Sequence, residues 1–116
     1  MSGRVLVIED DLDFRELIAE FLEIKGYEVN EAESLAEAVA QVQGGFEPGV
    51  AIIDWTLPDA TGADAVAAMR NLCPSTALIL ATGHGAAVTK DLEGEVRTIL
   101  RKPFKLTELI RWVAAE

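Results

Sequence analysis

The sequence predicts an α/β fold in which a parallel β-sheet is covered by helices on both faces. Two observations lead to this prediction. Short aliphatic runs alternate with amphipathic stretches five times along the chain, and most of the runs lack the polar alternation of a strand with one exposed face. The 116 residues suit one domain, and half of them are hydrophobic, which is enough to bury a core. We therefore expect residues 1–116 to form a single domain.

Five aliphatic runs are the expected strands. Most of them are rich in valine, isoleucine and leucine, and several stop abruptly at a polar residue. The second run is the weakest of the five. The expected strands are residues 4–8, 27–32, 50–53, 77–80 and 98–100.

The stretches between and after these runs are the expected helices, because their apolar residues recur at helical spacing. Asp11 or Asp13 can cap the start of the first helix, and Gly26 can end it. Ser34 and Glu37 have the spacing of a capping box at the start of the second helix. The apolar positions of the helices are Phe14, Leu17, Ile18, Phe21, Leu22, Ala38, Val39, Val42, Val66, Met69, Leu72, Leu106, Leu109, Ile110 and Val113.

The alternation of strands and helices favours one strand order. Parallel strands need long crossover connections, and these are right-handed in nearly all proteins. The natural five-strand solution is a doubly wound, flavodoxin-like sheet with the order 2-1-3-4-5 and about five helices. In such a sheet the carboxyl ends of all strands lie at one edge, where ligands bind.

The charge and the cysteine content exclude several classes of protein. The net charge is -10, from 20 acidic and 10 basic residues. Such a surface repels nucleic-acid phosphates and anionic lipids, which disfavours direct binding to DNA or to a membrane. The one cysteine, Cys73, excludes an internal disulfide and favours a reducing compartment. With no signal-peptide pattern and no apolar stretch of membrane-spanning length, the sequence indicates a cytoplasmic protein.

Polar side chains follow the expected strands at the edge where ligands bind. Glu9 and Asp10 follow the first strand, Asp54 the third, Thr82 the fourth and Lys102 the fifth. Two carboxylates 4 Å apart repel each other by roughly 4 kcal/mol at an effective dielectric near 20. We therefore expect a cation to bind between carboxylates that meet at this edge. An all-oxygen site suits Mg²⁺, and the lack of histidine and thiolate at the strand ends argues against zinc. Magnesium, a lysine and a hydroxyl together suit phosphoryl transfer, in which a carboxylate can be the nucleophile.

Four short motifs at the strand ends resemble the signature of receiver domains of two-component response regulators. They are Val-Ile-Glu-Asp-Asp at residues 7–11, Ile-Asp-Trp-Thr-Leu-Pro at 53–58, Ala-Thr-Gly at 81–83 and Lys-Pro-Phe at 102–104. Each motif alone is a weak signal, but the ordered set spans the whole chain. The resemblance implies a flavodoxin-like (CheY-like) fold and a signalling domain that is not an enzyme, with only self-directed phosphotransfer and autodephosphorylation.

The resemblance assigns a role to each residue at this edge. Asp54 would be the phosphoacceptor, taking its phosphoryl group from a sensor histidine kinase or a phosphotransfer protein. Asp10, Asp54 and the backbone carbonyl of Thr56 would bind Mg²⁺ directly, and Glu9 would bind it through water. Thr82 and Lys102 would contact the phosphoryl oxygens.

The resemblance also concerns residues around these positions. The peptide bond before Pro103 is expected to be cis, which would direct Lys102 inward. Thr56 and His84 would lie along the path of the water that removes the phosphoryl group, so His84 is a candidate for tuning its lifetime. A solvated loop histidine is the alternative for His84. Trp55 is expected at the mouth of the site.

The sequence departs from the family pattern in two places. Ile99 stands where the family usually has an aromatic residue that swings inward on activation, which puts the usual coupling from Thr82 to the output face in doubt. The segment between Thr82 and Lys102 is also short, and we expect residues 84–94 to be irregular, with at most one short helix around residues 88–92. Both departures also occur in receivers of hybrid sensor kinases, so that origin stays open.

Three other classes of protein were weighed. A non-phosphorylated pseudo-receiver would normally have lost Asp54, Lys102 or the acidic pair, and all of these are present. A phosphatase with an aspartate nucleophile needs a second carboxylate at the position of Thr56. A flavin carrier needs a hydroxyl- and glycine-rich loop after the first strand, where the acidic residues would repel a flavin phosphate. The kinase, the output partner, the regulated process and the oligomeric state cannot be inferred from the sequence.

Overall fold

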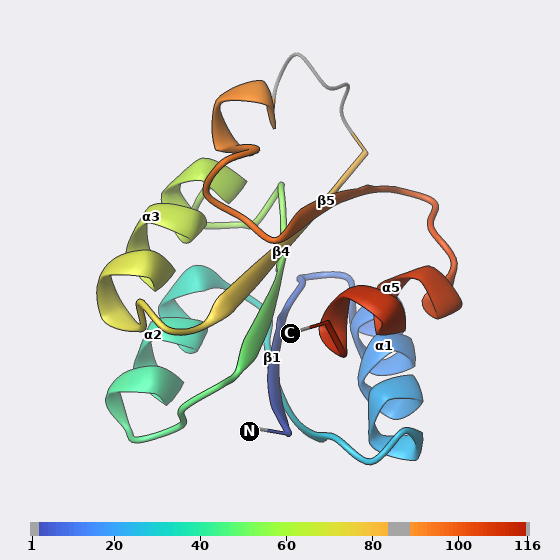
Figure 1. The fold of residues 1–116 in the computed structure, drawn as a ribbon. Helices are drawn as coiled ribbons and strands as arrows, with labels where there is room; N and C mark the ends of the chain where they lie inside the picture. The colour runs from blue at the N-terminus through green and yellow to red at the C-terminus, as the bar shows by residue number, and fades with distance from the viewer. Residues whose placement is uncertain (1–2, 84–88, 116) are drawn as a thin grey trace.

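The computed structural model describes residues 3–83 and 89–115, and in them strands and helices alternate along the chain (Figure 1). The elements are β1 (Arg4–Ile8), α1 (Leu12–Ile24), β2 (Glu28–Ala32), α2 (Leu35–Gln43), β3 (Val50–Asp54), α3 (Gly62–Leu72), β4 (Ala77–Thr82), the 3-10 helix η1 (Lys90–Leu92), β5 (Thr98–Arg101) and α5 (Leu106–Val113).

The strands form one parallel sheet with the order β2-β1-β3-β4-β5, so the predicted fold class and strand order are confirmed. In register, Ile8 of β1 lies opposite Ile53 of β3, and Asp54 lies opposite Ala81 of β4. The strands therefore end at nearly the same level. The residues that follow their carboxyl ends come together at one edge of the sheet.

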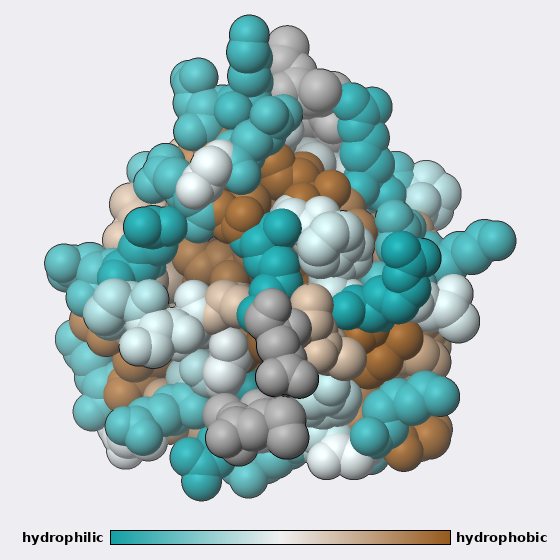
Figure 2. Space-filling view, viewed as in Figure 1, coloured by the Kyte–Doolittle hydropathy of each residue, from teal (hydrophilic) through white to brown (hydrophobic). Residues whose placement is uncertain are grey.

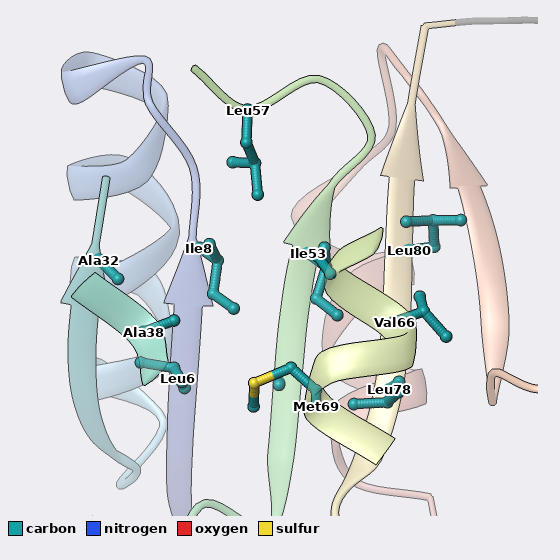
Figure 3. Close-up of a cluster of buried hydrophobic side chains, with 12 residues drawn as sticks. Leu6, Ile8, Ala32, Ala38, Ile53, Leu57, Val66, Met69, Leu78 and Leu80 are labelled. Atoms are coloured by element: carbon teal, nitrogen blue, oxygen red, sulfur yellow. The ribbon is translucent and has the colours of Figure 1, made fainter. Parts of the chain in front are cut away.

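The side chains of the strands fill a hydrophobic core on each face of the sheet. In β1, Leu6 and Ile8 face the layer under α2 and α3, whereas Val5 and Val7 face the layer under α1 and α5. All four are fully buried, which explains why the first strand has no polar alternation. Figure 1 shows α2 and α3 on one side of the sheet and α1 and α5 on the other, and Figure 3 shows the first of the two layers.

The helix starts are capped largely as the sequence predicts. The side chain of Asp11 accepts a hydrogen bond from the backbone N–H of Phe14 at the start of α1. Ser34 caps α2 in the same way, but Glu37 accepts from the N–H of Glu33 instead of completing the capping box. The complete capping box lies at the start of α3, formed by Thr61 and Asp64, and it was not predicted.

The number of helices differs from the expected value. The described residues contain four α-helices and one three-residue 3-10 helix, whereas about five helices were expected. Between residue 89 and the start of β5, the chain forms this 3-10 helix and turns, as expected for the irregular part of the segment. No side chain caps η1, and turns through Gly94 follow it. Residues 84–88, including His84, lie outside the described residues.

The surface mixes polar and apolar residues. Figure 2 shows hydrophilic residues over much of one face, with several separate apolar areas between them. The exposed large apolar side chains among the described residues are Leu12, Leu17 and Ile24 of α1. Across residues 3–83 and 89–115, every helix falls short of the length and apolar character needed to cross a membrane.

Candidate functional site

The structure brings the residues predicted at the strand ends together at the carboxyl edge of the sheet. Glu9 directly follows β1, Asp54 ends β3, Thr82 ends β4, and Lys102 directly follows β5. Glu9, Asp54 and Thr82 are buried, with exposed fractions of 4%, 6% and 1%, whereas Asp10 is exposed. The site therefore has a buried floor and one carboxylate at its mouth.

The ammonium group of Lys102 joins two of the carboxylates. Its Nζ donates hydrogen bonds to Oε1 of Glu9 and to Oδ1 of Asp54, each at 2.9 Å. The peptide bond between Lys102 and Pro103 is cis, as expected. These contacts link positions that lie 93 and 48 residues apart in the chain.

An aromatic pair also lies against Lys102. Its Nζ is 5.1 Å from the centroid of the Phe14 ring, within the range of a cation–π interaction. The Phe14 ring packs edge-on against Phe104, with the centroids 5.7 Å apart. The helical spacing of the sequence predicts Phe14 on an apolar face, but it does not predict this contact with the lysine.

The pKa values of Glu9 and Lys102 reflect this packing. Burial raises the pKa of Glu9 to about 7, although the hydrogen bond from Lys102 opposes the shift. Burial alone would lower the pKa of Lys102, but its hydrogen bonds to Asp54 and Glu9 outweigh this effect and raise the pKa above its usual value. The lysine therefore stays charged in the site at neutral pH.

The acidic side chains have the arrangement of a cation site. One carboxylate oxygen each from Glu9, Asp10 and Asp54 lies within 4.8 Å of the other two. Hard oxygen donors and an exposed approach past Asp10 fit Mg²⁺, which binds carboxylates and keeps several of its waters. Thr56, whose carbonyl is the remaining predicted ligand, is exposed and pairs with Thr61 in a short bridge. Its role as a ligand stays a prediction.

Arg15 of α1 is a residue at this site that the sequence analysis missed. Its Nη1 donates a hydrogen bond of 2.8 Å to the backbone carbonyl of Glu9, and its Nε donates one of 3.0 Å to Oε1 of Glu31. The guanidinium group therefore fixes the backbone of Glu9 between the ends of β1 and β2. Its place in the first turns of a helix beside two acidic strand ends was the available signal.

Trp55 packs beside the site on the loop that follows Asp54. It is half-buried and contacts the hydrophobic layer under α2 and α3. Its carbonyl accepts a hydrogen bond of 2.6 Å from the N–H of Gly62. A Cβ atom at Gly62 would lie only 2.5 Å from Cε3 of Trp55, so the close approach requires glycine.

Ile99 is half-buried in β5 and packs against the same hydrophobic layer. Together with Thr89, Thr98 and Arg101 it lines a hollow of about 330 Å³. A branched aliphatic side chain here cannot present a polar tip to solvent. The weakened coupling expected from Ile99 stays a prediction.

Comparisons with known proteins agree with the fold. The model of the response regulator receiver domain matches residues 5–114. The acid tolerance regulatory protein ActR of Rhizobium meliloti is 35% identical over 85 residues, which cover 73% of this chain and 43% of ActR. A CheY-like receiver domain from Methanospirillum hungatei superposes with a TM-score of 0.87 at 25% identity and covers 96% of this chain and 90% of its own. The response regulator TrrA of Thermotoga maritima, solved in complex with Mg²⁺-BeF, superposes with a TM-score of 0.84 at 27% identity, covering 97% of this chain and 96% of its own.

These similarities and the site define a receiver domain of the kind found in two-component systems. The chain belongs to the response regulator receiver domain family, which the family match over residues 5–114 establishes. It spans about half the length of the curated relatives that it matches.

Proposed function

We propose that the chain is a phosphoacceptor switch that takes a phosphoryl group onto Asp54 from a sensor histidine kinase or a phosphotransfer protein. The observation that carries this proposal is the contact between Lys102 and Asp54 beside two further carboxylates. This arrangement leaves a nucleophilic carboxylate, a fixed cation and an oxygen-lined cation site within one small region.

The proposed reaction is a direct transfer between a phosphohistidine and Asp54. A carboxylate oxygen of Asp54 attacks the phosphorus, the bond between phosphorus and the imidazole nitrogen breaks, and its electron pair returns to the ring. Asp10, Asp54 and the Thr56 carbonyl would hold Mg²⁺ directly and Glu9 would hold it through water, and the ion would supply charge neutralisation at the phosphoryl oxygens. Lys102 and Thr82 hold the oxygens that the transferred group brings.

The added charge is proposed to convert the chemical step into a signal. A phosphoryl group brings about −1.5 to −2 charge and three acceptor oxygens at pH 7. Thr82 is the last residue of β4. A phosphoryl group that contacts Thr82 would therefore bias the conformation at the end of this strand. The charge of −10 opposes direct contact of this chain with nucleic acid. The lone cysteine fits a cytoplasmic location.

Phosphorylation by acetyl phosphate tests this proposal without the kinase. The wild-type protein is incubated with acetyl phosphate and Mg²⁺, and the intact mass is measured. The expected result is one added phosphoryl group, which is absent in Asp54→Asn and present in Asp91→Asn, an exposed control. It should also be absent when EDTA removes the metal. A wild-type protein that gains no phosphoryl mass would instead be a non-phosphorylated interaction module, and the proposal would be wrong.

A further inference from the structure

The side chain of Asp59 ties the loop after the phosphoacceptor to a helix that is distant in sequence. Its Oδ1 accepts a hydrogen bond from the backbone N–H of Leu35, and its Oδ2 accepts one from the N–H of Ala36, both at 2.9 Å. The partners lie 24 and 23 residues away in the chain. One carboxylate thus bridges the loop between β3 and α3 and the first turn of α2.

The first turn of α2 also has a cap of its own. The hydroxyl of Ser34 accepts a hydrogen bond of 3.1 Å from the N–H of Glu37. The free N–H groups of the first turn are therefore satisfied by two residues, one next to the helix and one from the loop. The N–H groups of Leu35 and Ala36 also lower the pKa of Asp59, so its carboxylate stays charged around neutral pH. Ser34 offers a natural control, because it caps the same helix without touching the loop.

The loop that Asp59 connects to α2 contains the one backbone group proposed as a metal ligand. It begins directly after Asp54 and includes Thr56, whose carbonyl is a proposed metal ligand. Leu57, only 7% exposed, anchors the inner side of the loop in the hydrophobic layer, where Figure 3 shows it directed between Ile8 and Ile53. Asp59 anchors the outer side. The backbone around Thr56 is thus held from both directions.

We propose that Asp59 is a positioning residue for the metal site, holding the loop so that the carbonyl of Thr56 faces the carboxylates of Asp10 and Asp54. This inference rests on the proposed function, because it requires that the site binds Mg²⁺. Coupling between two sites is reciprocal, so a loop ordered by Mg²⁺ must also hold Asp59 more firmly on α2. The start of α2 thereby responds to events at the phosphoacceptor.

The test compares Asp59→Ala, Asp59→Asn and Ser34→Ala in the full chain. Each variant also carries Trp112→Phe, so that Trp55 is the one fluorescent tryptophan. Mg²⁺ is titrated while Trp55 fluorescence is followed, and thermal unfolding is measured alongside. Asp59→Ala should weaken Mg²⁺ binding by about tenfold, the lower end of the effect of changing a residue that orients a metal ligand. The Mg²⁺ affinity of Asp59→Asn, which keeps one acceptor oxygen, should lie between that of the protein with Asp59 and that of Asp59→Ala. Ser34→Ala should lower the unfolding temperature but leave Mg²⁺ affinity within about twofold.

Amide hydrogen exchange provides the readout that a plain helix cap would not change. In the protein with Asp59, saturating Mg²⁺ should slow exchange at the amides of Leu35 and Ala36. In Asp59→Ala the same addition should leave these amides unaffected. The parent protein carries Trp112→Phe alone. If Asp59→Ala and Ser34→Ala bind Mg²⁺ as tightly as this parent, Asp59 is a helix cap and the inference is wrong. If the parent itself binds no Mg²⁺ and accepts no phosphoryl group, the proposed function fails and the inference falls with it.

Discussion

The Nζ of Lys102 lies 2.9 Å from an oxygen of Asp54 and 2.9 Å from an oxygen of Glu9, so one ammonium group holds two buried carboxylates together. The lysine side chain keeps 29% of its surface exposed, whereas the Glu9 and Asp54 side chains keep 5% and 8%. The lysine can therefore be reached by a ligand at the mouth of the site while its partners stay fixed.

Replacing Lys102 by methionine should destabilise the metal-free protein. The change keeps the length of the side chain but leaves Glu9 and Asp54 without their shared cation. We expect the free energy of unfolding to fall by about 2–4 kcal/mol, because removing one partner strands a buried charge. Urea unfolding in EDTA measures the change. Lys105→Met, at an exposed lysine, is the control, and an equal effect of both changes would contradict the prediction.

The stability of the metal-free protein should depend on pH through Glu9. The folded state raises the pKa of Glu9 from its ordinary value of 4.5 to about 7, so between these values the folded chain holds a proton that the unfolded chain releases. The contribution of Glu9 to the free energy of unfolding is therefore fully present below about pH 4.5 and is lost as the pH rises to about 7. The loss amounts to at most about 3 kcal/mol.

Unfolding by urea at several pH values, in EDTA, checks this pH dependence. Glu9→Gln should remove the part of the slope that lies between pH 4.5 and 7, because glutamine does not titrate. Glu16→Gln, at an exposed glutamate of α1, should keep the slope of the wild type. A Glu9→Gln protein whose stability follows the same pH profile as the wild type would show that the pKa of Glu9 is ordinary.

Replacing Arg15 by methionine should loosen the backbone at Glu9. The variant loses hydrogen bonds to the Glu9 carbonyl and to Glu31 from a side chain that is only 12% exposed. We expect a loss of about 1–2 kcal/mol in the free energy of unfolding. Arg111→Met, at an exposed arginine of α5, should change it by less than about 0.5 kcal/mol. Equal stabilities for the two variants, measured by urea unfolding, would argue against a role for Arg15 in the site.

Gly62→Ala should disturb Trp55. The added methyl group would lie 2.5 Å from Cε3 of the indole and 3.0 Å from a methyl carbon of Leu80, so the ring or the helix start must shift. We expect a loss of about 1–3 kcal/mol and a change in tryptophan fluorescence. Gly94→Ala, where nothing lies within 4 Å of the new methyl group, is the matched control. Unchanged fluorescence in Gly62→Ala would mean that Trp55 is not packed as described.

The sequence was sufficient to predict the sheet order and the residues at its carboxyl edge. These predictions depend on local patterns, because each strand is a short aliphatic run and each polar residue directly follows one. Lys102 could be placed beside Asp54 because parallel strands share an edge, although 48 residues separate them. The family resemblance added the roles of these residues, which remain part of the proposal.

The residues that the sequence did not predict act through contacts between distant segments. Asp59 contacts Leu35, and Arg15 contacts Glu31, only once the chain has folded. A loop aspartate has no local pattern that distinguishes it from a surface charge, and the only signal for Arg15 was its place in the first turns of a helix beside two acidic strand ends. The capping box of Thr61 and Asp64 is different, because its spacing is visible in the sequence and could have been recognised.

The strand order also determines which backbone groups lie at the two margins of the sheet. β2 and β5 are these outer strands, and within residues 3–83 and 89–115 each of them pairs with a strand on one side only, which is the kind of position where a neighbouring molecule could add a strand. Glu28 and Glu31 in β2, and Arg101 in β5, place charges along these margins, and β5 has only four residues. Charged side chains on outer strands disfavour pairing with a second sheet. The strand order that brings polar residues together at the carboxyl ends therefore also leaves the two outer positions of the sheet to strands that carry charges.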